Sequence, residues 1–441
     1  MIPADETLHG FVQAFDMNFM RDALELHMPT LGSIASCRIE RFRYRKQNRA
    51  TFLYEIETST GRNWVTGSLY KGRKAKRSFE EAHENRNVSY VPELDMLLEQ
   101  FPQDRKLGYV SELMRGNDEV LLHALAPFFG SGLRLSIAEI IPVRYRPRIA
   151  AVFKVAISAV KEEKTAFHHF YVKIYAEDDI TKQFPDLSKN RDGLNFALLR
   201  PVAVIPQANA IVWPEIKGQS LSDVLPRSGN REHFFKAATA LSEFHQSHQV
   251  LVKVSADEVV RRDCIKHTEL ISSILPALSG DLDELTSSLA MAFDKQIFVP
   301  CHQDMKPEHI LFHNGRSVMI DVEGIALSDP ALDIGNMLAR ISAGWWLNNI
   351  SPQLCETAMA GFLNGIAPID NHRLVAAFAF GKIKTATFAI SHQVNNWARI
   401  ALNELEDARK AIRTSTIPEV IPISDKQEHK AARMRRRRQY I

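Results

Sequence analysis

The chain has 441 residues, 45% hydrophobic and 24% charged, a composition typical of a globular protein with two or three domains. Its formal net charge of +3 gives no overall preference for nucleic acid. The N-terminus lacks a signal-peptide pattern and no apolar run approaches the length expected of a bilayer span, so we expect a cytoplasmic protein without a membrane partner. The four cysteines are scattered without paired spacing, which disfavours a disulfide framework and a zinc site.

Two stretches of the chain, residues 40–71 and 142–173, resemble each other. The tripeptide RYR at 43–45 recurs at 144–146, and both stretches show alternating apolar residues around a polar turn. Such alternation is typical of strands with one exposed face. Each stretch ends in a strand with a lysine, and Lys71 falls on Lys173. Chance similarity is the alternative, but we interpret the pair as a duplication.

Downstream of the second stretch the pattern changes from strands to helices. Residues 208–215 read as a short apolar strand, whereas residues 231–249, 266–294 and 370–412 have the apolar spacing of helices. We therefore predict an α+β fold with a β small lobe and a mostly helical large lobe, preceded by a β-rich accessory domain that is a degenerate copy of the small lobe. The expected boundaries are 1–130 for the accessory domain, 131–215 for the small lobe, 216–425 for the large lobe and 426–441 for a basic tail.

Residues 299–340 contain the groups that phosphoryl transfer needs, namely a carboxylate to orient the acceptor hydroxyl and ligands for a cation. Asp304, on a loop after an apolar strand, is the expected orienting base, and Lys306 is placed to contact the transferred phosphate. The Asn-Gly pair at 314–315 between two apolar runs predicts a β-hairpin. Because the outer ends of a hairpin meet, positions 309 and 321 should lie together beside Asp304.

Two acidic residues follow the predicted hairpin. Asp321 is expected to hold magnesium between the phosphates, since a hard cation prefers oxygen ligands. Glu323 is expected to supply a second ligand or to orient a water. The alternative is that these acids only cap turns.

Three motifs in this region carry a family resemblance. HQDMKPEH at 302–309 resembles the catalytic loop of protein kinases and, more closely, that of the aminoglycoside phosphotransferase and choline kinase superfamily. IDVE at 320–323 resembles the metal-binding strand end of that superfamily, and DPALDIG at 329–335 the helix start that follows. The resemblance implies a bilobal protein-kinase-like fold. It also implies that Asp333, a candidate N-cap for a helix at 334–341, braces the catalytic loop, and that His302 packs behind this loop.

The chain departs from the superfamily pattern at two places. Position 309 usually holds asparagine, but here it is His309, and imidazole suits manganese, zinc or iron better than magnesium. The change is consistent with a shifted metal preference, a single-metal site or lost catalysis. We therefore expect ATP with Mg²⁺, or with Mn²⁺, as cofactors. Between positions 143 and 155 there is no glycine, so the glycine-rich phosphate loop is missing.

The nucleotide is expected to contact two further segments. Lys173, on an alternating strand, is the candidate phosphate-binding lysine and needs an acidic partner. The segment around Pro214 lies where this superfamily reads adenine through backbone groups. Because this proline has no N–H to donate, the contacts are expected from its neighbours Trp213, Glu215 and Ile216. The sequence leaves four acids open as partners of the lysine: Glu177, Asp178, Asp179 and Asp186.

These features predict an ATP-dependent phosphotransferase that acts on a hydroxyl of a small polar metabolite, a sugar or an aminoglycoside-like molecule. Its acceptor is expected between the catalytic loop and the C-terminal helices, where Trp345, Trp346 and Trp397 could stack on a sugar, although aromatics at such positions more often pack in the core. The alternative is a catalytically impaired pseudokinase that binds nucleotide or acts as a scaffold. No specific nucleic acid partner is expected, although the basic tail would suit an anionic partner.

Overall fold

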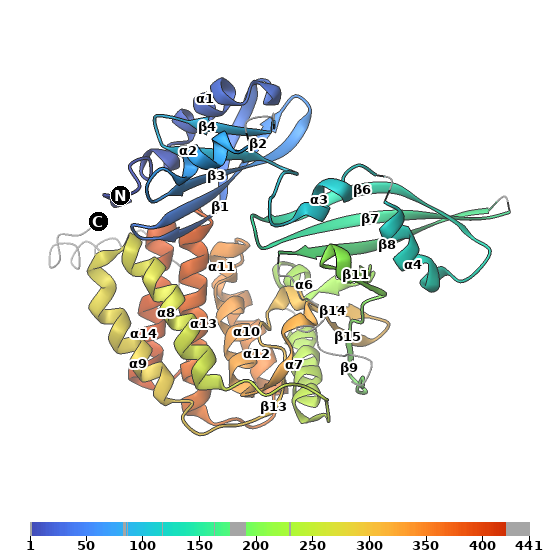
Figure 1. The fold of residues 1–441 in the computed structure, drawn as a ribbon. Coiled ribbons are helices and arrows are strands. Elements are labelled where there is room, and N and C mark those ends of the chain that lie inside the picture. The colour runs from blue at the N-terminus through green and yellow to red at the C-terminus, as the bar shows by residue number, and fades with distance from the viewer. Residues whose placement is uncertain are drawn as a thin grey trace.

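The computed structural model describes residues 2–82, 85, 87–116, 118–162, 164–176, 191–228 and 231–419. Two five-stranded sheets lie beside a helical lobe (Figure 1). The first sheet has the order β1-β2-β3-β5-β4 and the second the order β10-β11-β8-β7-β6. The predicted basic tail lies outside the described residues.

The first sheet is antiparallel and packs on α1 (Met17–His27). Its strands are β1 (Ile34–Arg45), β2 (Arg49–Thr58), β3 (Gly61–Tyr70), β4 (Val88–Val91) and β5 (Met96–Gln100), with α2 (Lys74–Glu80) between β3 and β4. Alternation along β1 and β2 places Phe42, Phe52 and Tyr54 on one face, where they form an aromatic core with Phe11 and Phe15. The opposite face of β2 carries Leu53, which belongs to the core of the second sheet.

The second sheet has its own pair of helices, α3 (Gly108–Leu113) and α4 (Glu119–Phe129). Its strands are β6 (Arg134–Arg146), β7 (Ala150–Lys161), β8 (Lys164–Tyr175), β10 (Ala203–Ile205) and β11 (Ala210–Pro214). Val110 and Leu121 from the helices share one core with Phe153 and Phe170 from the strands. The helices therefore belong with the second sheet, although the sequence assigned residues up to 130 to the first domain.

The two sheets have the same topology, since each consists of a three-stranded meander followed by two strands in reversed order. Asp5 accepts hydrogen bonds from the Tyr44 hydroxyl at 2.6 Å and from the backbone N–H of the turn that follows. Asp104 does the same with Tyr145, at 2.9 Å, and the next turn. We propose that the units are duplicated copies and that the second begins near Asp104, not at residue 131.

Strand pairing corrects the predicted equivalence of Lys71 and Lys173. In the first copy Tyr44 pairs with Ala50, which pairs with Leu69, the residue after Ser68. In the second copy the matching tyrosine, Tyr145, pairs with Ala151, which pairs with Ile174, the residue after Lys173. Ser68, not Lys71, therefore occupies the lysine position, and Lys71 is exposed just beyond β3. The first copy accordingly has no lysine at this position.

The large lobe is mostly helical, and with the second sheet it confirms the predicted bilobal α+β fold. The stretch 266–294, predicted to be helical, contains the end of one helix and the whole of the next, because Pro276 opens a short 3-10 turn between them. The helices are α6 (Leu221–Ser228), α7 (Arg231–Gln246), α8 (Ala256–Ile274), α9 (Ser279–Met291), α10 (Pro330–Ser342), α11 (Gly344–Leu347), α12 (Pro352–Gly365), α13 (Asn371–Ser391) and α14 (Trp397–Thr414). The short strands are β9 (Phe196–Leu198), β12 (Gln219–Ser220), β13 (Val299–Cys301), β14 (Ile310–His313), β15 (Arg316–Met319) and β16 (Ala326–Ser328).

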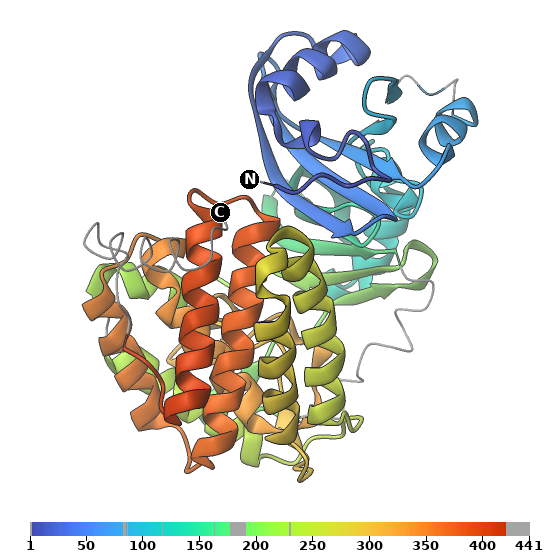
Figure 2. The same cartoon turned by 90° about the vertical axis from the view of Figure 1, so that its left-hand side faces the viewer.

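The accessory domain rests on the helical lobe. Strand β1 contacts α8 and α13, and the first sheet stands above the ends of these helices (Figures 1 and 2). Among the described residues, one helix, α13, is long enough and apolar enough to cross a bilayer, which the sequence analysis did not expect. However, 83% of its apolar window is buried in the fold, where α13 packs against α10 and α14, as a core helix does.

Candidate active site

The predicted hairpin is present and brings two candidate ligands together. Strands β14 and β15 pair around Asn314 and Gly315, whose positive φ values of 49° and 78° suit a two-residue hairpin turn. Beyond the strands, the Ile320 N–H donates to the His309 carbonyl at 3.0 Å. As a result, His309 Nε2 lies 3.2 Å from Asp321 Oδ2.

The catalytic loop adds Asp304 to this pair. Potential ligand atoms of Asp304, His309 and Asp321 all lie within 4.8 Å of one another. The His309 side chain is only 7% exposed, whereas that of Asp304 is 50% exposed and open to an incoming molecule. The structure therefore places the predicted base and the predicted metal ligands in one site.

The protonation of His309 shows that this donor set fits a cation. Burial, reinforced by the charges of Lys306 and His302, lowers the pKa of His309 to about 3, so its imidazole is neutral. Its Nδ1 lies 3.0 Å from the Asp304 carbonyl oxygen, to which it must donate its one proton. Nε2 then directs a lone pair at the Asp321 carboxylate. Two acceptors at this separation need a positive charge between them, which a divalent cation supplies.

Lys173 reaches this site from β8. Its Nζ lies 2.7 Å from Asp321 Oδ1 and 2.7 Å from Glu323 Oε1. Burial lowers the pKa of Lys173, but the two carboxylates outweigh it and hold the pKa above its usual value. Lys173 in turn holds the pKa of Asp321 well below its usual range, against the effect of burial. The four acids proposed from the sequence, Glu177, Asp178, Asp179 and Asp186, lie outside the described residues.

Glu323 has a second contact that sequence reasoning missed. The Tyr175 hydroxyl donates to Glu323 Oε1 at 2.5 Å. Tyr175 is two residues after Lys173 on the same strand and therefore on the same face, so the alternation in the sequence could have found it. The other oxygen, Oε2, is buried without a hydrogen-bond partner among the described residues, and is free to act as a ligand.

Asp304 is ionised at neutral pH. Burial raises the pKa of Asp304, but nearby positive charges, first those of Lys306 and Lys384, outweigh burial and lower the pKa to about 2. The Lys306 Nζ lies 2.9 Å from Asp304 Oδ2. The loop therefore presents a carboxylate with an adjacent cation, which suits an acceptor hydroxyl next to a phosphate.

Asp333 holds the catalytic loop from behind, as the resemblance implied. Its buried carboxylate accepts hydrogen bonds from the backbone N–H groups of His302 at 2.7 Å and Gln303 at 2.9 Å. His302 Nε2 contacts the Ile320 carbonyl at 2.8 Å, so this ring also packs behind the loop. Asp333 is not the N-cap of the helix, however. Helix α10 begins at Pro330 and is capped by Asp329.

Asn336 is a second brace that the sequence analysis missed. It lies one turn after Asp333 on the same face of α10, and its Nδ2 donates to the Met305 carbonyl at 2.5 Å. The catalytic loop is thus fixed on both sides of Asp304 by one helix.

The predicted adenine-reading residues lie at the end of β11 and in the linker after it. Trp213 is buried in β11. The Glu215 N–H donates to the His169 carbonyl at 3.0 Å, and its carboxylate pairs with Lys154 at 2.6 Å. Because the N–H and the carboxylate of Glu215 are engaged within the small lobe, its carbonyl and the backbone of Ile216 remain the candidates for a contact with adenine.

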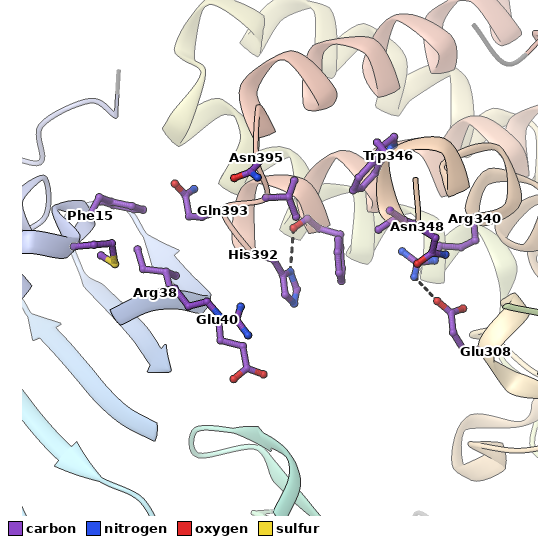
Figure 3. A pocket seen from close by; sticks show the side chains of 15 residues that line it. Phe15, Arg38, Glu40, Glu308, Arg340, Trp346, Asn348, His392, Gln393 and Asn395 are labelled. Carbon is purple, nitrogen blue, oxygen red and sulfur yellow. Dashed lines mark hydrogen bonds and ion pairs between the residues drawn. The ribbon is translucent and has the colours of Figure 1, made fainter. Parts of the chain in front are cut away.

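A cavity of about 740 Å³ opens between the accessory domain and the large lobe (Figure 3). Of the three predicted tryptophans only Trp346 lines it, while Trp345 and Trp397 pack on the core. The wall includes Glu308 from the catalytic loop, which pairs with Arg340 at 2.8 Å. Other lining residues come from β1 and from the turn between α13 and α14, among them Arg38, Glu40, His392, Gln393 and Asn395.

Comparison with known proteins gives the family of the catalytic region. Residues 151–370 match the phosphotransferase enzyme family. The chain is similar to a choline/ethanolamine kinase family protein from Mesorhizobium loti, with 14% identity and a TM-score of 0.45 over 72% of this chain and 98% of that one. It is also similar to a choline kinase from Cryptosporidium parvum, with 14% identity and a TM-score of 0.43 over 64% and 92% of the two chains. Among curated proteins, none matches this sequence.

Proposed function

Because residues 151–370 belong to the phosphotransferase enzyme family, we propose that the protein transfers the γ-phosphoryl group of ATP to a hydroxyl of a small polar metabolite, a sugar or an aminoglycoside-like molecule. One observation carries this proposal. Asp304 and Asp321, which follow different strands, have carboxylate oxygens within 4.8 Å of each other, and Lys173 from the small lobe pairs with Asp321. Phosphoryl transfer needs an orienting carboxylate, a cation holder and a phosphate-binding lysine in one place.

Each residue then has a defined role. Asp304 accepts a hydrogen bond from the acceptor hydroxyl and orients its oxygen toward the γ-phosphorus, and Lys306 offsets the charge of the transferred group. Lys173 binds the nucleotide phosphates. Asp321, His309 and Glu323 hold Mg²⁺ or Mn²⁺, which supplies charge neutralisation on the phosphates when bound. Asp333 and Asn336 keep the loop in place.

Nucleotide binding is the first test. We expect ATP with Mg²⁺ or Mn²⁺ to raise the thermal midpoint, since a ligand at 100 times its Kd stabilises a protein by about 2.7 kcal/mol. In Asp321→Asn the metal-dependent part of this shift should disappear, because the cation loses its carboxylate ligand. Turnover is then measured as ADP release against a panel of hydroxyl acceptors. Wild-type protein that shows no shift with either metal would contradict the proposal, whereas a shift without turnover on any acceptor would favour the pseudokinase.

The metal preference depends on His309. In His309→Asn an amide oxygen replaces the imidazole, so we expect the ratio of Mg²⁺-supported to Mn²⁺-supported turnover to rise roughly tenfold. Initial rates at saturating ATP over a series of concentrations of each metal measure this ratio. The matched control is His372→Asn, an exposed histidine at the start of α13. An unchanged ratio in His309→Asn would show that His309 does not bind the catalytic metal.

A further inference from the structure

Three arginines, one from each part of the molecule, lie close enough to His392 at the cavity to influence its pKa. They are Arg41 on β1, Arg144 on β6 and Arg340 on α10. Burial lowers the pKa of His392 to about 3, with a further contribution from these three positive charges. His392 and Arg340 line the cavity (Figure 3), whereas Arg41 and Arg144 lie outside its lining but within electrostatic range of His392.

Strand pairing shows which way the β6 arginines face. Arg144 pairs with Val152, which pairs with Lys173, so these side chains emerge from the same face of the sheet. In the next such row Arg146 stands in line with Tyr175. Lys173 and Tyr175 both reach the acids of the active site, so Arg144 and Arg146 face the same cleft.

The accessory domain contributes its arginines to this cleft through a fixed contact. The Arg43 guanidinium donates to the Pro147 carbonyl in the turn after β6, at 2.5 Å. Arg41 lies two residues before Arg43 on the same face of β1, opposite Leu53, which packs in the core of the second sheet. The first copy of the duplicated unit is therefore bound to the second by this hydrogen bond, and Arg41 lies on the face of β1 that is directed toward the small lobe.

These arginines carry positive charge that the described residues do not neutralise. Within the described part of the chain, Arg41, Arg144 and Arg146 have no ion-pair partner, and Arg146 Nε is buried without a hydrogen bond. Burial and then the neighbouring arginines lower the pKa of Arg41 to about 9. Of the two acids on the wall, Glu308 pairs with Arg340, and Glu40, which lies 3.6 Å from Arg62, offsets only part of the charge of Arg41. Arg144 is exposed, whereas Arg41 and Arg146 are partly buried, and clustered guanidinium groups that are partly buried are costly unless an anion pairs with them.

We propose that the acceptor carries an anionic group, a carboxylate or a phosphate, which Arg41 and Arg144 bind while its hydroxyl meets Asp304. The inference rests on the proposed function and narrows its substrate class. Guanidinium groups bind both anions through paired hydrogen bonds. Cationic acceptors such as aminoglycosides or choline would meet repulsion here. Arg146 is assigned instead to the nucleotide phosphates, because it stands in the same cross-strand row as Tyr175, which hydrogen-bonds to Glu323 in the active site.

The acceptor class is tested with wild-type protein and four hydroxyl compounds. ADP release is measured with glucuronate, glucose 6-phosphate, glucose and kanamycin. We expect kcat/KM to be about 10–100-fold higher for one or both anionic sugars than for glucose, with no turnover of kanamycin. The two anionic compounds distinguish a carboxylate site from a phosphate site. A preference for glucose or kanamycin would overturn the inference and leave the proposed function standing, whereas failure of ATP to stabilise the protein would overturn the proposed function itself.

Variants then locate the site. Arg41→Gln and Arg144→Gln should each raise the KM for the preferred anionic sugar about 10–100-fold with a much smaller change in kcat, because one charged hydrogen-bond donor is lost. The matched control is Arg134→Gln, an exposed arginine at the far end of β6, where no change is expected. Binding of inorganic phosphate at saturating AMP-PNP, followed by calorimetry, should weaken in the same two variants. An unchanged KM in both variants would overturn the inference.

Discussion

Replacing Asp304 by asparagine is expected to lower kcat by about 10²–10⁴-fold. The amide has the same shape, but it cannot take the proton of the acceptor hydroxyl or stabilise it as a carboxylate does. Asp304 suits this role because it is ionised, with a pKa of about 2, and half exposed at the open side of the site. Nucleotide-induced stabilisation should persist, since Lys173, Asp321 and Glu323 are untouched.

The measurement is single-turnover phosphoryl transfer, which separates chemistry from product release. The matched control is Asp294→Asn, an exposed aspartate in the loop before β13, for which kcat should stay at the wild-type value. If Asp304→Asn kept wild-type kcat while Asp321→Asn abolished turnover, Asp304 would have no part in orienting the acceptor. Loss of the thermal shift in Asp304→Asn would instead mean that the residue belongs to the nucleotide site.

The sequence predicted the part of the site whose geometry depends on residues close together in the chain, namely the hairpin that carries His309 and Asp321. The Asn-Gly turn fixes the hairpin, and the hairpin fixes the positions of His309 and Asp321, because each strand has only four residues. For this reason three motifs in order were sufficient to place the base beside the metal ligands. Asp333 braces backbone groups 31 and 30 residues before it, so its role was expected from the family resemblance and not from a local signal.

The rest depends on contacts between segments far apart in the chain. The acids at Lys173 were sought on the following segment, but Asp321 and Glu323 come from the large lobe, and no spacing rule links them to β8. The cavity wall similarly joins β1 to the turn after α13. Even the duplication was aligned wrongly at its end, since the tripeptide anchor fixes one strand, whereas the two strands that follow are longer in the second copy, with a two-residue turn in both.

Removing one charge from the buried ion pair behind the cavity wall is expected to destabilise the folded protein strongly. Lys382, only 2% exposed, lies 3.2 Å from Glu404 and 3.0 Å from Asp407. Glu404 is 1% exposed and also accepts the Trp346 indole N–H at 2.9 Å. Burial lowers the pKa of Lys382, but the two carboxylates outweigh it, so the pKa is raised and the ammonium stays charged. Lys382→Met leaves Glu404 as a buried unpaired charge, which costs about 3–5 kcal/mol of unfolding free energy.

The double variant Lys382→Met with Glu404→Gln is the decisive comparison. It removes both charges and keeps an oxygen for the Trp346 indole, so it should be more stable than Lys382→Met alone, with a coupling of about 0.5–3 kcal/mol. Chemical denaturation monitored by circular dichroism measures the three variants. Lys236→Met, which removes an exposed helical ion pair with Glu232, is the control and should change stability by less than about 0.5 kcal/mol. If Lys382→Met cost no more than that control, the ion pair would not stabilise the fold.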